Sequence, residues 1–292
     1  MTTRLTDLLD LVRAPAALTV LGDTVVGATN ARGRVGANAP ALSVSSACLY
    51  AAGMALNDYA DADLDAVERP ERPIPSGRVS RSTALGVGAA LTVGGVGLAF
   101  AAGKASGWVS LALAASVWTY DLVAKPTRFG PLVMAACRGL DVLMGAAGPG
   151  WRRAIVPALV VAAHTASLTV IARGEVNGTT STTAAATAAA SVGAAAAAVA
   201  GSAPHTTAAL LGGAGFLAAA LPSQIEAAQH PDASHARAAA RASIHAMVPL
   251  QIALVARTGA NAATAALLGV QAAGRLLARL RAKSAVVTGD VT

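Results

Sequence analysis

The stretch NDYADADLDAVERPERPIPSGRVS, which begins at residue 57, places four carboxylates in nine residues directly after an apolar run. On a helix that turns about 100° per residue, Asp58, Asp61 and Asp65 lie within about 60° of one another, whereas Asp63 points to another side. Three carboxylates on one face repel one another unless a cation joins them. Oxygen ligands without His or Cys favour a hard ion such as Mg²⁺. The spacing therefore predicts a magnesium site from which Asp63 is excluded.

The arginines that follow these carboxylates predict an anion-binding function. Magnesium held by a few carboxylates usually shares its coordination shell with phosphate oxygens, and the arginine fork matches phosphate geometry. Pro70, Pro73 and Pro75 are expected to keep the following segment extended, because proline fixes φ and lacks an N–H. We therefore interpret residues 57–82 as an Asp-rich motif with a cap loop. The alternative is a solvated loop whose mixed charges only keep it wet.

The helices on either side of this motif are predicted to lie in a membrane. Of the 292 residues, 54% are hydrophobic and only 13% are charged, a balance typical of membrane proteins. Alanine, valine, leucine and glycine supply most of the apolar residues, and small side chains let helices approach closely in lipid. The net charge of +7 does not indicate nucleic acid, because the basic residues lie at the ends of apolar runs. We expect a lipid bilayer as the environment and no nucleic-acid partner.

The apolar runs predict an all-α, polytopic transmembrane bundle of about nine helices that forms one domain over residues 1–292. The first run is too polar for a cleaved signal peptide. Lysines and arginines are more frequent on the side of the N-terminus, so the positive-inside rule places the Asp-rich motif in the cytoplasm and the chain in the cell membrane as a multi-pass protein. The predicted runs are 13–30, 39–56, 83–103, 106–122, 131–149, 153–173, 181–201, 205–221 and 242–258, with a weaker tenth at 260–280.

The motif that begins at Asn57 resembles the first aspartate motif of the UbiA superfamily of intramembrane prenyltransferases, NDxxDxxxD followed by RPxRPxPSG. The stretch TYDLVAKP resembles the family's tyrosine and lysine at the end of the fourth helix, here Tyr120 and Lys125, and CRGLDVLMGAAG resembles its fifth-helix pattern, with Arg138. The resemblance implies a central cavity with Mg²⁺ and an isoprenyl diphosphate at its cytoplasmic mouth.

The resemblance also implies roles for individual residues. A departing diphosphate is neutralised by metal and cationic side chains, and a dry cavity protects the carbocation that remains. The expected metal ligands are Asn57, Asp58, Asp61 and Asp65. The expected catalytic residues are Asp58, Asp61, Asp65, Tyr120 and Lys125. The expected substrate-binding residues are Asn57, Arg69, Arg72, Lys125, Arg138, Asp141, Arg173 and Glu175.

The second acidic motif of the family, DxxxD, is missing here. The corresponding loop, residues 174–180, overlaps the stretch IARGEVNG (171–178), which offers only Arg173, Glu175 and Asn177 as polar candidates. Asp141 stands where the family commonly has Asn, and it either supplies the missing carboxylate or forms a salt bridge with Arg138 one turn away. Reduced second motifs of this kind resemble the EboC-like branch of the superfamily.

A further polar stretch, SQIEAAQHPDASH, is expected to form a cytoplasmic loop. Its histidines and acids invite a zinc interpretation, but an ordinary polar connection is favoured. The polar residues in this stretch are Gln224, Glu226, His230, Asp232 and His235.

The sequence thus predicts a Mg²⁺-dependent prenyltransferase that moves an isoprenyl group from an isoprenyl diphosphate to an unidentified small acceptor. One alternative is a UbiA-type terpene cyclase, in which a double bond of the prenyl chain captures the cation. Another is a non-catalytic membrane protein that only binds the isoprenyl diphosphate.

Overall fold

The computed structural model describes residues 4–13, 19–201 and 204–287, and within these ranges the chain is helical and contains no strand. The predicted all-α class is therefore confirmed. The helices are α1 (Leu5–Leu11), α2 (Leu21–Arg32), α3 (Ala39–Ala60), α4 (Ala62–Glu68), α5 (Arg81–Ala102), α6 (Lys104–Thr119), the π-helical turn η2 (Tyr120–Ala124), α7 (Gly130–Ala146), the 3₁₀ helix η3 (Trp151–Ala154), α8 (Ile155–Ala172), α9 (Ser181–Val199), α10 (Thr206–Gln229), α11 (Ala233–Ala256) and α12 (Asn261–Val287).

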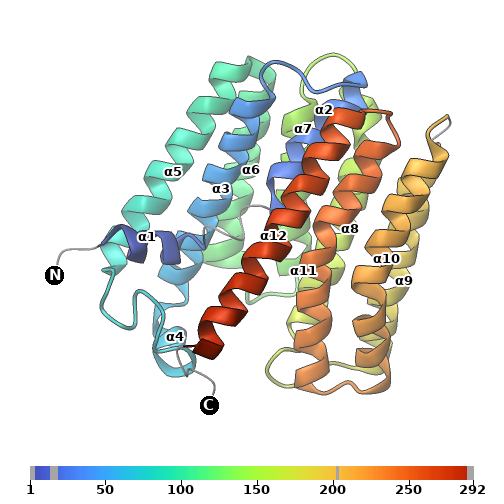
Figure 1. The fold of residues 1–292 in the computed structure, drawn as a ribbon. Helices are drawn as coiled ribbons and strands as arrows, with labels where there is room; N and C mark the ends of the chain where they lie inside the picture. Colours follow the sequence, from blue (N-terminus) through green and yellow to red (C-terminus); the bar gives the residue numbers. More distant parts are fainter. Residues whose placement is uncertain (1–3, 14–18, 202–203, 288–292) are drawn as a thin grey trace.

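The long helices lie side by side in an up-and-down bundle (Figure 1). At one end, drawn uppermost, lie the connections from α2 to α3, from α5 to α6 and from α7 to α8. At the other end lie α4, the loop between α8 and α9, and the turn between α10 and α11. The Asp-rich motif and the reduced second-motif loop therefore share one end of the bundle.

Side-chain caps fix the beginnings of several helices. The Ser80 hydroxyl accepts a hydrogen bond from the backbone N–H of Thr83 at the start of α5, and Thr180 accepts one from Thr183 at the start of α9. Such caps satisfy amides that have no partner inside the helix. Because α5 begins at the cap loop, its capping also anchors the loop that follows the Asp-rich motif.

Close approach between α2 and α7 depends on glycine. A Cβ atom at Gly27 would lie 1.9 Å from the carbonyl oxygen of Val142, and one at Gly145 would lie 2.1 Å from the carbonyl oxygen of Thr24. The two backbones therefore touch where side chains would hold them apart, as is common between helices in lipid. This contact holds α7, and the site residues on it, directly against α2.

The positions of the long helices agree with most of the predicted apolar runs. Within the described residues, seven helices are long and apolar enough to cross a membrane. Residues 14–18 of the first predicted run lie outside the described residues. The Ala-rich segment predicted at 181–201 is a packed helix, α9, with Ala184 and Ala198 fully buried.

Two local expectations were wrong. The stretch around residues 222–235 is not a loop, because α10 continues to Gln229 and α11 begins at Ala233. The segment after the Asp-rich motif is not extended but folds into successive turns, closed by hydrogen bonds such as Ser76 N–H to Arg72 C=O (3.0 Å). The φ angle that proline fixes suits a turn as well as an extended chain, and Gly77, at φ +72°, supplies a left-handed position.

Candidate functional site

The Asp-rich motif lies on two helices that are almost continuous. Asp61 interrupts the helical geometry between α3 and α4, but its N–H still bonds to the carbonyl of Asn57 (2.9 Å), and the N–H of Asp65 bonds to the carbonyl of Asp61 (2.8 Å). Asp58 and Asp65 therefore keep the common face expected from helical spacing. Both side chains are only 3% exposed.

These two carboxylates converge on one guanidinium. Arg72 Nη1 lies 3.2 Å from Asp58 Oδ1 and 2.7 Å from Asp65 Oδ2. The turns of the cap loop bring Arg72 back over the helix that precedes it. Arg13, from the segment before α2, also donates to Asp58 Oδ1 at 2.8 Å, so a single buried carboxylate is held by two arginines.

Asp61 faces the opposite wall of the site. Its carboxylate forms an ion pair with Lys125, which follows the π-helical turn η2. π-Helical turns are rare in proteins overall, and many of those that occur lie at functional sites. In the same turn, Asp121 Oδ1 accepts a hydrogen bond from Asn57 Nδ2 at 3.4 Å. The ends of α3 and α6 are thus joined by two polar contacts.

Asp63 lies apart from this cluster. Its side chain is 89% exposed and pairs with Arg81 at the start of α5. Its direction agrees with the helical-face argument that excluded it.

The N-terminal helix α1 packs against the cap loop through Arg78. Its Nη1 atom lies 3.2 Å from Asp7 Oδ1 and 3.0 Å from Asp10 Oδ2. The backbone N–H of Arg4 and then the Arg78 guanidinium hold the pKa of the Asp7 carboxyl below its usual range. Charge pairing therefore ties α1 to the loop that carries Arg72.

A cavity of about 470 Å³ runs from this cluster into the bundle. Apolar side chains from α3, α6, α8 and α11 form much of its wall, so it can hold a hydrocarbon chain beside a polar mouth. The predicted site residues that line it are Asn57, Asp61, Arg69, Arg72, Tyr120, Lys125, Arg138, Asp141 and Glu175. Asp58, Asp65 and Arg173 are not among its lining residues.

Arg138 and Asp141 lie on the inner wall of the cavity. Arg138 Nε lies 2.8 Å from Asp23 Oδ2 on α2, and Asp23 is fully buried. Asp141 instead accepts a hydrogen bond from the Ser46 hydroxyl at 2.5 Å. The alternative of an Arg138–Asp141 salt bridge is therefore wrong, because α2 brings a different carboxylate to Arg138.

The reduced second-motif loop divides its residues between two surroundings. The side chain of Arg173 donates to the backbone carbonyls of Lys125 and Thr127 and so fixes the connection between η2 and α7. Glu175 lines the cavity, while its backbone carbonyl accepts a hydrogen bond from Arg237. The loop thus brings one carboxylate to the cavity.

Three residues near the site were not identified from the sequence as site residues. Arg13 and Asp23 lie in the first predicted apolar run, and Asp121 lies between Tyr120 and Lys125. The signal for Asp121 was present, since a carboxylate at the end of an apolar helix is costly unless it is paired. Asp23, inside the first apolar run, carried the same signal. The partners of Arg13 and Asp23 lie on other helices, so only the tertiary packing brings them near.

The donor set fits a hard divalent cation. The candidate ligands are amide and carboxylate oxygens, and Asp58 and Asp65 already converge on one positive group. Among the residues that the structure describes, no three His, Cys, Asp or Glu side chains stand together as a preformed metal cluster. In this structure, Arg13, Arg72 and Lys125 neutralise the carboxylates instead.

Fold and site together define a helical membrane protein with an internal cavity whose mouth is lined by carboxylates and basic side chains. The model of the UbiA prenyltransferase family matches residues 24–248, so the chain belongs to this family. It is a multi-pass membrane protein of that fold.

The chain is also similar to named enzymes over part of its length. The chain is 37% identical over 139 residues to the digeranylgeranylglyceryl phosphate synthase of Ignicoccus hospitalis, covering 47% of this chain and 45% of that protein. It is 44% identical over 95 residues to the enzyme of the same name from Methanopyrus kandleri, covering 30% and 35% of the two chains. The matched segments therefore span less than half the length of these relatives.

Solved structures share the fold. A UbiA homologue from Aeropyrum pernix superposes with a TM-score of 0.57 at 19% identity, covering 77% of this chain and 96% of that one. A UbiA homologue from Archaeoglobus fulgidus bound to GPP and Mg²⁺ superposes with a TM-score of 0.52 at 15% identity, covering 90% and 99%.

Proposed function

We propose that this protein is a membrane-embedded, Mg²⁺-dependent prenyltransferase that uses an isoprenyl diphosphate as donor and faces the cytoplasm with its active site. The observation that carries the proposal is the charge arrangement at the cavity mouth. Arg72 lines the cavity and pairs with Asp58 and Asp65 behind it, and Asp61 and Lys125, which both line it, pair with each other. A site for a metal diphosphate needs both signs of charge within reach of one another. An apolar cavity behind them suits a prenyl chain.

Asn57, Asp58, Asp61 and Asp65 would hold the metal. Bound Mg²⁺ supplies positive charge that stabilises the departing diphosphate. Arg72 and Lys125 are now paired with carboxylates, and both can turn to diphosphate oxygens, for which the arginine fork and the ammonium are suitable donors. Arg69 lies at the same mouth and adds positive charge.

The remaining residues of the cavity keep the reaction dry and oriented. Leu113, Val117 and Met247 line the wall and exclude water, which would otherwise trap the allylic cation. The ring of Tyr120 lines the same cavity near Lys125, where its electron-rich face can stabilise positive charge. The bond from C1 of the prenyl group to the diphosphate oxygen breaks, and its electron pair leaves with the diphosphate. The new bond forms between C1 and the acceptor, which releases one proton.

The acceptor is a small molecule that enters the same cavity. The names of the Ignicoccus and Methanopyrus relatives support a glyceryl phosphate carrying one prenyl ether as the first acceptor to test. Ser46, Thr165 and Thr169 line the cavity, and their hydroxyls, which donate to protein oxygens, can accept a hydrogen bond from a polar acceptor.

Product analysis tests the proposal. The purified chain is incubated with isoprenyl diphosphates of graded length, with and without Mg²⁺, in the presence of geranylgeranylglyceryl phosphate or 4-hydroxybenzoate. A conjugate that forms only with Mg²⁺ supports prenyl transfer. A cyclic hydrocarbon or alcohol would identify a terpene cyclase, and recovery of all donors unchanged would leave a protein that only binds them.

A further inference from the structure

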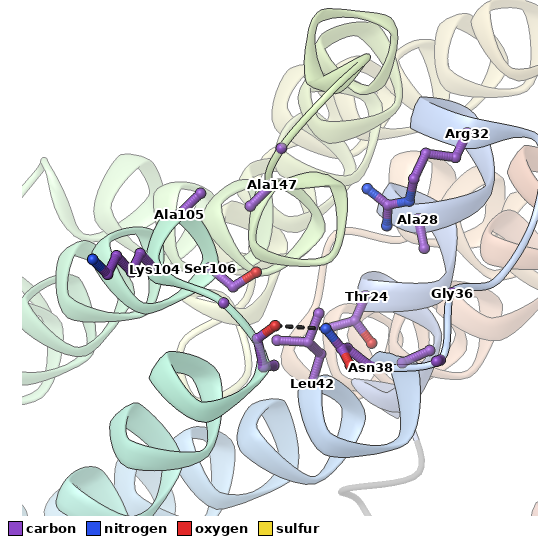
Figure 2. Close-up of a pocket in the computed structure, with 15 residues that line it drawn as sticks. Thr24, Ala28, Arg32, Gly36, Asn38, Leu42, Lys104, Ala105, Ser106 and Ala147 are labelled. Atoms are coloured by element: carbon purple, nitrogen blue, oxygen red, sulfur yellow. Dashed lines mark hydrogen bonds between the residues drawn. The ribbon is translucent and has the colours of Figure 1, made fainter.

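A second cavity lies at the end of the bundle opposite the Asp-rich motif. Its volume is about 340 Å³, and it lies between the beginnings of α3 and α6, the end of α5, the side of α2 and the loop after α7 (Figure 2). Small apolar side chains form part of its wall, among them Ala28, Ala39 and Ala105. Neither the family resemblance nor the proposed reaction uses this cavity.

The backbone carbonyls at the C-terminal ends of α5 and α7, beside this cavity, already have hydrogen-bond donors. The carbonyl of Ala102, the last residue of α5, accepts a hydrogen bond from Asn38 Nδ2 at 2.6 Å (Figure 2). At the end of α7, Arg32 donates to the carbonyls of Gly145 and Ala146 at 2.8 Å and 3.2 Å. These donors supply hydrogen bonds to terminal carbonyls at both C-termini.

The beginning of α6 has no such compensation. Its N-cap residue is Gly103, which has no side chain to accept hydrogen bonds, and the first amide bonded there is that of Gly107. Among the described residues, the three preceding amides of α6 have no acceptor. Unpaired amides at a helix N-terminus form a site that favours an anion.

Ser106 gives an independent indication of a ligand. It lies on the first turn of α6, is only 6% exposed, and forms no hydrogen bond through its hydroxyl within the described part of the chain. Figure 2 shows this hydroxyl directed into the cavity. The side chain is thus more than nine-tenths buried, and its unpaired hydroxyl can reach a ligand only through the cavity.

The charges around the cavity have one sign. Arg32 and Lys104 line it, and no acidic side chain does so among the described residues. Arg32 bonds only to neutral carbonyls, so its charge is not cancelled. Lys104 also contributes to the lining, but its ammonium is directed away from Ser106 and Arg32 (Figure 2), which leaves Arg32 as the cation that faces the cavity.

We propose that this cavity binds a phosphate group through the α6 amides, the Ser106 hydroxyl and the positive charge of Arg32. The phosphate belongs either to the headgroup of a membrane phospholipid or to a soluble phosphate. The site is separate from the prenyl-transfer cavity and would be occupied in the opposite leaflet or at the opposite surface of the membrane.

Gly103 allows a sharp test. Its φ of 164° is extended backbone that any residue adopts, and a Cβ atom there would meet nothing within 4 Å. Aspartate at this position would cap the α6 amides and place a negative charge where the phosphate binds, yet it would also support the helix. Gly103→Ala is the matched control, since it adds a side chain without charge or acceptor.

The full-length protein in non-ionic detergent is titrated with dihexanoyl phosphatidylglycerol, with inorganic phosphate and with dihexanoylglycerol, and the bound species are counted by native mass spectrometry. We expect tenfold or weaker binding of the phosphate-bearing probe in Gly103→Asp, binding within twofold of wild type in Gly103→Ala, and weaker binding in Ser106→Ala. The thermal unfolding midpoint of Gly103→Asp should not fall.

The outcomes separate the two sources of phosphate. Binding of phosphatidylglycerol without inorganic phosphate identifies a lipid headgroup, and the reverse identifies a soluble phosphate. Equal binding in Gly103→Asp and wild type, or equal binding of dihexanoylglycerol, would overturn the proposal. Phosphate bound at the motif end is unaffected by Gly103 and so does not imitate the expected result.

Discussion

The guanidinium of Arg13 lies 2.8 Å from Asp58, which joins the segment before α2 to the Asp-rich motif. Asp58 is also held by Arg72, so two cations occupy a carboxylate that we propose as a magnesium ligand. Metal binding must therefore compete with at least one of these ion pairs. Arg13 is the one with no proposed role in binding diphosphate.

Removing the competing charge should favour the metal. We expect Arg13→Gln to bind Mg²⁺ at about fivefold lower half-saturating concentration. The variant loses about 1 kcal/mol of unfavourable free energy, which arises because the guanidinium repels Mg²⁺ and competes with it for Asp58. Calorimetric titration of the substrate-free protein with Mg²⁺ measures this. Arg128→Gln, which removes a charge that lies over the Phe129 ring and forms no ion pair among the described residues, serves as the control. Weaker Mg²⁺ binding in Arg13→Gln would show that Arg13 supports the site instead.

The carboxylates of the motif should differ in importance. Asp61→Asn and Asp65→Asn should lower Mg²⁺-dependent turnover by roughly 100-fold or more, as expected for groups that stabilise charge in the transition state. Asp63→Asn should leave turnover within about twofold, because its exposed pair with Arg81 contributes about 1 kcal/mol or less. Similar losses at all three positions would contradict the separation of Asp63 from the site.

The basic residues at the mouth should recognise the diphosphate rather than the prenyl chain. Arg72→Ala and Lys125→Ala should each weaken binding of an isoprenyl diphosphate by about tenfold or more, since each removes a charge-assisted hydrogen bond. Binding of the corresponding isoprenyl alcohol should change little. Fluorescence or calorimetric titration with both ligands measures the difference. If the alcohol is weakened as much as the diphosphate, the two side chains act only through the structure.

The contact between α2 and α7 should be intolerant of added volume. Gly145→Ala should lower stability by about 2–3 kcal/mol, because its Cβ would lie 2.1 Å from a backbone oxygen that cannot turn away. Gly86→Ala in α5 has open space and should be neutral or stabilising by about 0.5–1 kcal/mol. Thermal unfolding in detergent compares the two variants. A stable Gly145→Ala protein would mean that α2 and α7 can separate at little cost.

Asp232 should make the start of α11 sensitive to acid. Hydrogen bonds from the Ser234 hydroxyl and then from His235 hold the pKa of this carboxyl below its usual value of about 3.9. A carboxyl whose pKa is lower in the folded than in the unfolded protein stabilises the fold. This stabilisation is complete above the pKa of the unfolded state and is lost as the pH falls through the pKa of the folded state.

Wild type should therefore lose helix protection at α11 as the pH falls below about 4. Asp232→Asn keeps an N-cap but does not titrate, so its protection should change less over the same range. Hydrogen exchange of the first turn of α11 measures this. Identical pH profiles in the two proteins would exclude Asp232 as the titrating group.

The sequence alone determined the class of the protein and the local geometry of its motif. Hydrophobic runs predict membrane helices because every backbone polar group must be satisfied inside a lipid phase. Helical spacing separated Asp63 from Asp58 and Asp65 because the angle between side chains on one helix depends only on their positions in the chain. These are short-range properties, and they needed no knowledge of neighbouring helices.

The ion-pair and hydrogen-bond partners of the site residues depend on how the helices pack in the tertiary structure. Asp23 and Arg138 are 115 residues apart, and the glycine contact between α2 and α7 brings them to 2.8 Å. That packing assigned Arg138 to Asp23 rather than to Asp141, which lies one turn away on the same helix. Which carboxylate receives a cation in a bundle depends on how closely two helix backbones approach, and a linear pattern of residues does not contain that distance.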